Sequence, residues 1–142
     1  MITRRRSLML VPTLLLLLAG CAPRGPVFRP VTQLPQDKAL VYIYRVSAFF
    51  GGGVTYTVRA GDEEIVDLAT GGYYPYLAEP GEREFWARTE AKASTTEQLR
   101  AGETYYLRGG IGLGFFIGHP KLAFVSRVEG EREIGSCRLI AK

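Results

Sequence analysis

From Lys38 onward, short runs of β-branched and aromatic residues follow one another along the chain, and a glycine-bearing turn separates most of them. In 54–60 apolar and polar residues alternate, which is typical of a strand with one buried face. The run 39–45 is apolar at almost every position and therefore suits a central strand covered on both faces. Short strands at this spacing predict a β-sandwich or barrel.

We therefore expect an all-β fold, a seven- to eight-stranded antiparallel sandwich of the immunoglobulin or prealbumin-like kind. Two of the strands, 95–100 and 104–108, are expected to pair as a hairpin across the turn Ala101-Gly102-Glu103. The expected strands are 39–45, 54–60, 65–68, 73–77, 83–89, 95–100, 104–108 and 122–128.

The tail after the last expected strand has the pattern of one short C-terminal helix. Ser126 and Glu129 have the spacing of a capping box, and Ile134 and Cys137 then fall on one helical face. Gly130 lowers the intrinsic helix propensity of this segment.

Residues 1–20 follow a different pattern. Arg4-Arg5-Arg6 precede an apolar run of eleven residues, 8–18, and small residues close the segment. A basic start, an apolar centre and a small-residue end are the parts of a secretory signal peptide. A membrane-spanning helix needs roughly 20 apolar residues, so we expect cleavage of this segment and not a membrane span.

The residues Leu18-Ala19-Gly20-Cys21 resemble the end of a bacterial lipoprotein signal. The resemblance implies cleavage between Gly20 and Cys21, a diacylglyceryl thioether on Cys21 and acylation of the new amine. It also implies a lipid-anchored protein at the outer membrane, facing the periplasm, because Ala22 and not an aspartate follows the cysteine. Arg5-Arg6-Ser7-Leu8 loosely resembles a twin-arginine export signal, but the leucine-rich centre favours the general secretory route.

Four prolines lie in the segment 21–37 that follows. Prolines at this density exclude a helix or a central strand. We expect 21–37 to be a lipidated tether, extended at about 3.1 Å per residue, and the β-sandwich to occupy 38–142.

The formal charge of the whole chain is +4, from 18 basic and 14 acidic residues. Removal of the three signal arginines leaves 15 basic against 14 acidic residues, or +1. The basic residues of 24–142 are scattered among acidic ones, without the patch or stripe that nucleic acid requires. The expected partners are therefore the membrane, through the lipid on Cys21, and an envelope protein or cell-wall glycan.

The chain has two cysteines, so lipidation of Cys21 would leave Cys137 without an intrachain partner. Burial of Cys137 as an apolar thiol is the favoured interpretation, because Ile134 and Leu139 lie close in sequence. Pairing between two molecules is the alternative in an oxidising compartment.

Candidate catalytic and metal-binding residues are few. His119 is the one histidine, and a triad needs a base beside a nucleophile, so we expect no catalytic residue here. His119 and Cys137 are too few for a structural zinc site. The acidic residues Asp62-Glu63-Glu64 and Asp67 lack the glycine and the alternating spacing of a calcium loop. We expect neither a metal nor a cofactor.

Five glycines lie in 109–118, but their GxGxG spacing does not open a helix as a dinucleotide loop does. Phe115 and Phe116 in this stretch, with Phe49 and Phe50, are candidate binding residues if two loops expose them together at one end of the sandwich. The alternative, which we favour, is a glycine-bulged strand whose phenylalanines cover the open end of the core.

The eight tyrosines form a second candidate surface. Neighbours such as Tyr105 and Tyr106 point to opposite faces of a strand, so one of each pair is expected to be buried and the other available. Outward tyrosines would stack on sugars or on a protein.

Several motifs occur in a fixed order across the domain. They are Ala39-Leu40-Val41-Tyr42-Ile43-Tyr44-Arg45, Gly51-Gly52-Gly53, Gly71-Gly72-Tyr73-Tyr74, Glu79-Pro80-Gly81, Ala101-Gly102-Glu103-Thr104-Tyr105-Tyr106 and Glu131-Arg132-Glu133-Ile134. In this order they resemble a family of small bacterial envelope lipoproteins known only as a domain of unknown function. The section 58–102 is also similar to the proline-glycine-hairpin domains of bacterial surface proteins. The resemblances imply a β-sandwich on a lipid tether and no catalytic residue.

We expect a membrane-anchored envelope lipoprotein, not an enzyme, whose β-sandwich acts as a binding or structural module. The alternative is a carboxylate-dependent hydrolase of the cell envelope that uses residues such as Glu63 or Glu90. A third hypothesis is a stress-responsive structural lipoprotein without a small ligand.

Overall fold

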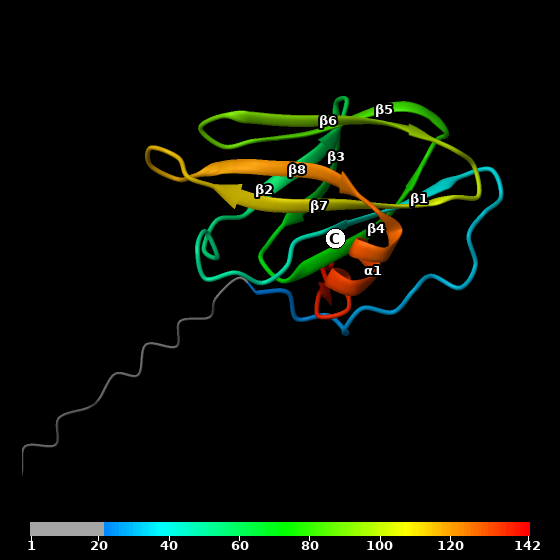
Figure 1. Ribbon diagram of the computed structural model, residues 1–142, viewed down its shortest axis with the longest axis horizontal. Helices are drawn as coiled ribbons and strands as arrows, with labels where there is room; N and C mark the ends of the chain where they lie inside the picture. The colour runs from blue at the N-terminus through cyan, green and yellow to red at the C-terminus, as the bar shows by residue number, and fades with distance from the viewer. Residues whose placement is uncertain (1–21) are drawn as a thin grey trace, which may run out of the picture.

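The computed structural model describes residues 22–142, which form a β-sandwich with one short helix (Figure 1). The larger sheet has the strand order β8-β7-β1-β4-β9, and the smaller sheet has the order β3-β2-β5-β6. The expected all-β sandwich is confirmed. The elements are β1 (Ala39–Tyr44), β2 (Tyr56–Ala60), β3 (Glu63–Leu68), β4 (Gly72–Ala78), β5 (Gly81–Arg88), β6 (Lys92–Leu99), β7 (Thr104–Gly112), β8 (His119–Val125), α1 (Arg127–Ile134) and β9 (Arg138–Leu139).

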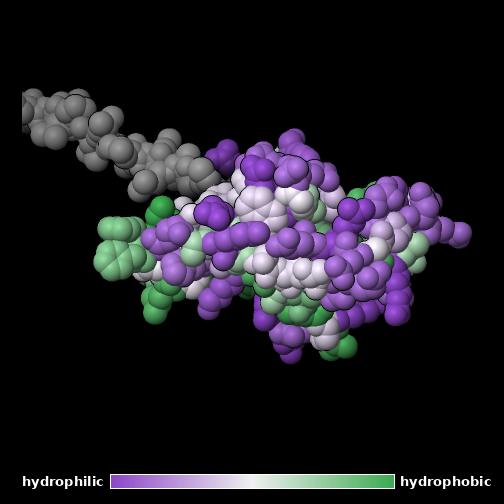
Figure 2. Space-filling model, turned by 90° about the horizontal axis from the view of Figure 1, so that it is seen from above, coloured by the Kyte–Doolittle hydropathy of each residue, from purple (hydrophilic) through white to green (hydrophobic). Residues whose placement is uncertain are grey.

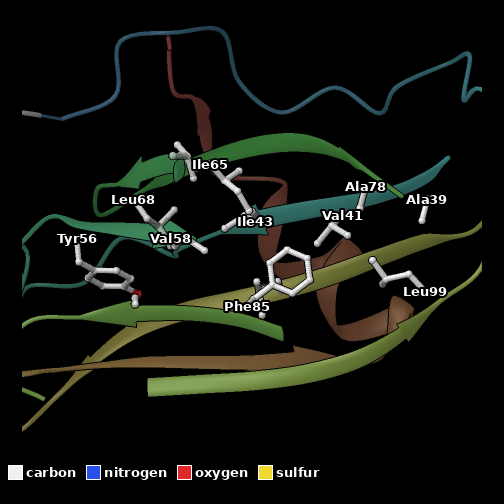
Figure 3. Close-up of a cluster of buried hydrophobic side chains, with 13 residues drawn as sticks. Ala39, Val41, Ile43, Tyr56, Val58, Ile65, Leu68, Ala78, Phe85 and Leu99 are labelled. Atoms are coloured by element: carbon white, nitrogen blue, oxygen red, sulfur yellow. The ribbon is translucent and has the colours of Figure 1, made fainter. Parts of the chain in front are cut away.

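The main core lies between the two sheets (Figure 3). Ala39, Val41 and Ile43 of β1 point into it, and Val58 and Phe85 from the smaller sheet meet them there. All five side chains are fully buried. Burial of this apolar surface is the main stabilising contribution to the sandwich.

The outer face of the larger sheet is covered as well. It carries four tyrosines that are at most 5% exposed, namely Tyr42, Tyr44, Tyr73 and Tyr106. Helix α1 and the residues before β1 lie over them. This second covered face explains why the sequence of β1 is apolar at consecutive positions, as expected for a central strand.

Residues 22–37 run along this outer face and do not form the free tether that their prolines suggested (Figure 1). The ring of Phe28 packs edge-on against Tyr42 and Tyr73, with ring centroids 5.1 Å apart in both pairs. The N–H of Phe28 donates to the carbonyl of Cys137 at 2.9 Å. Val27 also forms a single antiparallel bridge with Arg138 of β9, but the prolines on either side prevent a longer strand, so the rest of this extended segment packs on apolar rings. The packed structure therefore begins upstream of β1.

Strand pairing differs from expectation in two respects. β6 pairs with β5, and β7 lies in the other sheet between β1 and β8, so the hairpin expected between 95–100 and 104–108 is wrong. The reason is that β7 is covered on both faces, with Leu107 toward the core and Tyr106 toward α1, whereas every other residue of β6 is exposed. The chain thus crosses between sheets after β6, and β1 pairs with β7 in parallel, as does β4 with β9.

The glycine-rich stretch is partly strand. β7 continues to Gly112 and pairs with β8, which leaves 113–118 as the hairpin loop. Gly109 lies where a side chain has no room, because a Cβ there would be 2.5 Å from Leu68 Cδ2 and 2.6 Å from the Tyr56 hydroxyl. The glycine lets the two sheets approach at this point.

The predicted C-terminal helix is present as α1. Its N-cap is Ser126, whose hydroxyl accepts a hydrogen bond from the N–H of Glu129 at 3.2 Å, as the capping-box spacing indicated. Ile134 is buried at the end of the helix, and Cys137 follows as a buried free thiol. The Cys137 Sγ lies 3.7 Å from the carbonyl oxygen of Arg45, under the helix end.

Candidate functional site

Four loops meet at one end of the sandwich, which lies on the left in Figure 1. β1, β3, β5 and β7 end there and the strands that follow them begin there, as their registers show. We refer to this part of the molecule as the loop end. It consists of residues 45–55, 69–71, 89–91 and 113–118.

Large apolar side chains are exposed on the loop end (Figure 2). Phe49 is fully exposed, and Phe115 and Phe116 are 87% and 86% exposed. The favoured interpretation, in which the phenylalanines cover the core, is therefore wrong, because Tyr56, Leu68 and other side chains already fill the core at this end. We define the loop patch as Phe49, Phe50, Leu113, Phe115, Phe116 and Ile117.

The two aromatic loops touch the same side chain, Ile111. A Cβ at Gly51 would lie 2.8 Å from Ile111 Cβ, and a Cβ at Gly118 would lie 2.7 Å from Ile111 Cγ2. Both glycines have positive φ, +69° and +98°, a conformation that other residues rarely adopt. The two loops therefore lie together at one end of the sandwich, the arrangement that the exposed alternative required.

Arg45 holds the first aromatic loop from inside. Its side chain is fully buried, and its guanidinium donates to the carbonyls of Gly51 and Val54, at 2.6 Å each. It also lies 5.7 Å from the centre of the Tyr56 ring. Burial lowers the pKa of Arg45, so this charge is retained through its hydrogen bonds to the loop and not by a carboxylate.

Glu90 holds the second aromatic loop. Its carboxylate accepts the N–H of Phe116 at 3.0 Å and the N–H of Gly118 at 3.2 Å, and its side chain is 18% exposed. Burial raises its pKa, but the backbone N–H donors of 115–118 outweigh this effect and hold the pKa of Glu90 below its ordinary value. Nε2 of His119 lies 3.5 Å from the same carboxylate.

These two charged residues position the loop patch, and neither role was expected from the sequence. From the sequence, Arg45 is the last residue of an expected strand. Its position does offer a local signal, because a charged residue directly follows the apolar run 39–44 and precedes a glycine-rich loop. Glu90 offered no such signal, because its hydrogen-bond partners are 26 and 28 residues away along the chain.

A family model matches residues 35–118, more than half of the chain. Its description is a protein of unknown function, DUF2846. The chain belongs to the DUF2846 family. The small domain of unknown function that the motifs resembled is thereby confirmed. The matched part of the DUF2846 domain contains both aromatic loops, Arg45 and Glu90, and it ends before β8. No curated protein matches the sequence.

The candidate catalytic residues of this DUF2846 domain do not form one site. Glu63 begins β3 at the end opposite the loop end, where its carboxylate accepts a hydrogen bond from Tyr76 at 2.8 Å. Glu90 is engaged with the loop, and His119 is half-exposed beside it. The two carboxylates named for a hydrolase are therefore far apart in the fold. Within 22–142, no three or more His, Cys, Asp or Glu side chains are grouped to hold a metal ion.

The outward tyrosines expected to form a recognition surface are covered by 22–37 and α1. Trp86, on the outer face of the smaller sheet, is half-buried, and the charged groups of Arg59 and Lys92 lie 5.4 Å and 5.1 Å from its ring centre. The indole therefore already stacks on cations of its own chain. This leaves the loop patch as the strongest candidate surface of the domain.

Gly20 and Cys21, the residues predicted for cleavage and lipidation, lie outside the described residues. The next residue, Ala22, lines a hollow together with Thr55 and Ala69, which both belong to the loop end. The described chain therefore begins at the loop end. In the part of the chain that the structure covers, no helix is long and apolar enough to span a bilayer.

Proposed function

We propose that this protein is a lipid-anchored module of the bacterial cell envelope and that the loop end is its contact surface. Acylated Cys21 holds it at the outer membrane, facing the periplasm. The observation that supports this function best is the exposure of six large apolar side chains at the end of the sandwich where the described chain begins. A monomer rarely leaves a patch of this kind uncovered unless it contacts another surface.

The anchor itself is inferred from the signal peptide pattern. A basic start, an apolar run and Leu18-Ala19-Gly20-Cys21 precede the described domain. Because Ala22 lies at the loop end, an anchor on the preceding residue brings this end of the sandwich, and not the opposite one, toward the bilayer.

A binding or structural role agrees with the arrangement of the polar residues. Arg45 and Glu90 are engaged in holding loops, and the one ionisable neighbour of Glu90, the half-exposed His119 at 3.5 Å, lies beside a carboxylate that already accepts two backbone N–H groups. The domain presents a pair of exposed aromatic loops to its surroundings, which suits contact with a surface better than chemistry on a small substrate.

Metabolic labelling with radioactive palmitate, followed by membrane fractionation, tests the anchor. We expect the wild-type chain to carry label and to sediment with membranes, and Cys21→Ser to lose the label and leave the membrane. Cys137→Ala is the matched control and should keep the label, because this thiol is buried in the domain. Absence of label from the wild-type chain, or full label on Cys21→Ser, refutes the anchor.

A further inference from the structure

We propose that the loop patch inserts into the interface of the bilayer that carries the Cys21 anchor, so that the sandwich stands on the membrane with its loop end down. This inference rests on the proposed function and names the surface that the loop end contacts. The loop patch contacts the lipid headgroups and the upper part of the acyl chains, and it does not dock into a groove of another protein.

The first argument is where the chain begins. Ala22 lines an open hollow together with Thr55 and Ala69 of the loop end, and one residue extends at most about 3.6 Å. A lipid on Cys21 therefore brings the loop end, and not the opposite end of the sandwich, toward the membrane surface. Insertion of the patch then requires little further loss of translational freedom, because the anchor has already removed most of it.

The second argument is the chemistry of the tips. The loops 46–55, 69–71 and 113–118 contain no ionisable residue. Phe115 and Phe116 pack edge to face with ring centroids 4.8 Å apart, and both rings project into solvent. Aromatic and aliphatic side chains of this kind partition into the membrane interface, and the carboxylate of Glu90 lies on the backbone behind them.

The third argument is the state of the loop backbone. Moving an unsatisfied N–H out of water is costly. In 113–118 the N–H groups of Phe116 and Gly118 are bound to Glu90, and the carbonyl of Gly118 accepts a hydrogen bond from the Thr89 hydroxyl at 2.6 Å. Some of the backbone polar groups of this loop are therefore already hydrogen-bonded to protein side chains, which lowers the free-energy cost of moving the loop out of water.

The fourth argument is the charge around the patch. Arg88 precedes the loop 89–91, and the side chain of Lys121 runs along Gly112 at the base of the second aromatic loop. Both basic residues are exposed. Basic side chains around an apolar tip are complementary to anionic lipid headgroups.

A single introduced cysteine tests the inference in the full lipidated chain. Phe116→Cys is labelled with an environment-sensitive nitrobenzoxadiazole dye, and the protein is reconstituted into vesicles of phosphatidylethanolamine and phosphatidylglycerol with spin-labelled lipid as quencher. Val128→Cys is the matched control, because Val128 is 77% exposed on α1, away from the loop end, and shares the same anchor. Cys137 stays silent because it is buried.

We expect the dye at position 116 to shift to shorter emission wavelengths and to be quenched by the spin-labelled lipid, and the dye at 128 to show neither effect. A second variant adds Phe49→Ser and Phe115→Ser to Phe116→Cys and should lose most of the quenching. Equal signals at 116 and 128 overturn the inference. So does quenching at 116 that survives both serine substitutions, because the dye alone would then drive insertion.

Failure of the anchor gives a different result. The parent protein without an added cysteine should take no dye, because lipid occupies Cys21. Dye on Cys21, seen by mass spectrometry, refutes the proposed function, whereas a correctly anchored protein without quenching at 116 refutes membrane insertion alone. In the native envelope, crosslinking from position 116 that captures a protein and no lipid also overturns the inference.

Discussion

At the residue scale, one charged side chain fixes each aromatic loop from beneath. Arg45 donates to two carbonyls of the first loop, and Glu90 accepts two N–H groups of the second. A buried charge is costly unless hydrogen bonds compensate it, so the buried Arg45 is better explained by the loop geometry that it imposes than by a gain in stability. Glu90 is more exposed, and it acts through its two hydrogen bonds to the loop backbone. The hydrogen bonds of Arg45 and Glu90 thus restrain the backbone from which the exposed phenylalanines project.

Removal of the charge on Glu90 should release the second loop. We expect Glu90→Gln to speed amide hydrogen exchange at Phe116 and Gly118, because a neutral amide accepts these N–H groups more weakly than a carboxylate. Exchange measured by nuclear magnetic resonance checks this, with Glu82→Gln, an exposed glutamate on β5, as the control. Unchanged exchange in Glu90→Gln would contradict the assigned role.

Acid should act in the same direction as that substitution. The pKa of Glu90 is held below its ordinary value of 4.5, so the loop contribution is present above pH 4.5 and is lost as the pH falls through the lower value of the folded protein. The imidazole of His119 faces the same carboxylate from β8, with Nε2 at 3.5 Å. Loop protection that is lost already above pH 4.5 would contradict this sign.

Cys137 should be unreactive in the folded protein. Burial raises the pKa of its thiol from 9.0 to about 11, and the side chain has no exposed surface. We expect no alkylation by iodoacetamide near neutral pH and full alkylation after denaturation, both read by mass spectrometry. Ser136→Cys, one residue earlier and exposed, is the reactive control. Equal rates at 136 and 137 would show that the thiol is accessible.

The same shift has a consequence for stability. The folded state retains the Cys137 proton while the unfolded chain releases it from pH 9.0 upward, so this residue lowers stability as the pH rises from 9.0 toward about 11.

At the scale of elements, the outer face of the larger sheet decides how the C-terminal part of the chain packs. Helix α1 crosses Tyr106 so closely that a Cβ at Gly130 would lie 2.2 Å from the ring. From the sequence alone, Gly130 is only a residue that weakens the helix. In the fold it is the point of closest approach, and residues 22–37 cover the remainder of the face.

Substitution of the two helix glycines should therefore have opposite effects. Gly130→Ala should destabilise the fold by about 2 kcal/mol, because the ring of Tyr106 must move to admit the methyl group. Gly135→Ala has helical backbone angles and nothing closer than 4.0 Å, so it should be neutral or stabilising by about 0.5 kcal/mol. Urea denaturation measures the change in the free energy of unfolding for each variant. Equal changes would contradict the close packing of α1 against Tyr106 at Gly130.

At the scale of the whole molecule, the beginning of the described chain and the loop patch lie at the same end of the sandwich. The family match covers this end, from before β1 to Gly118, and leaves α1 and β9 outside. The part shared with the DUF2846 family therefore contains the proposed contact surface together with the residues that hold it.

Local patterns in the sequence were sufficient for eight of the nine strands, the capped helix and the sandwich class, but not for β9. The strands and the helix depend on neighbours a few residues apart, such as the alternation in 54–60 or the spacing of Ser126 and Glu129. The partner sheet of β7, the cover over the tyrosines and the exposure of Phe115 and Phe116 required the folded chain, because each depends on which distant residues already fill the available space. The role of Glu90 shows this dependence on the folded chain most clearly. Its carboxylate holds the second aromatic loop only because residues 26 and 28 positions away direct their N–H groups toward it.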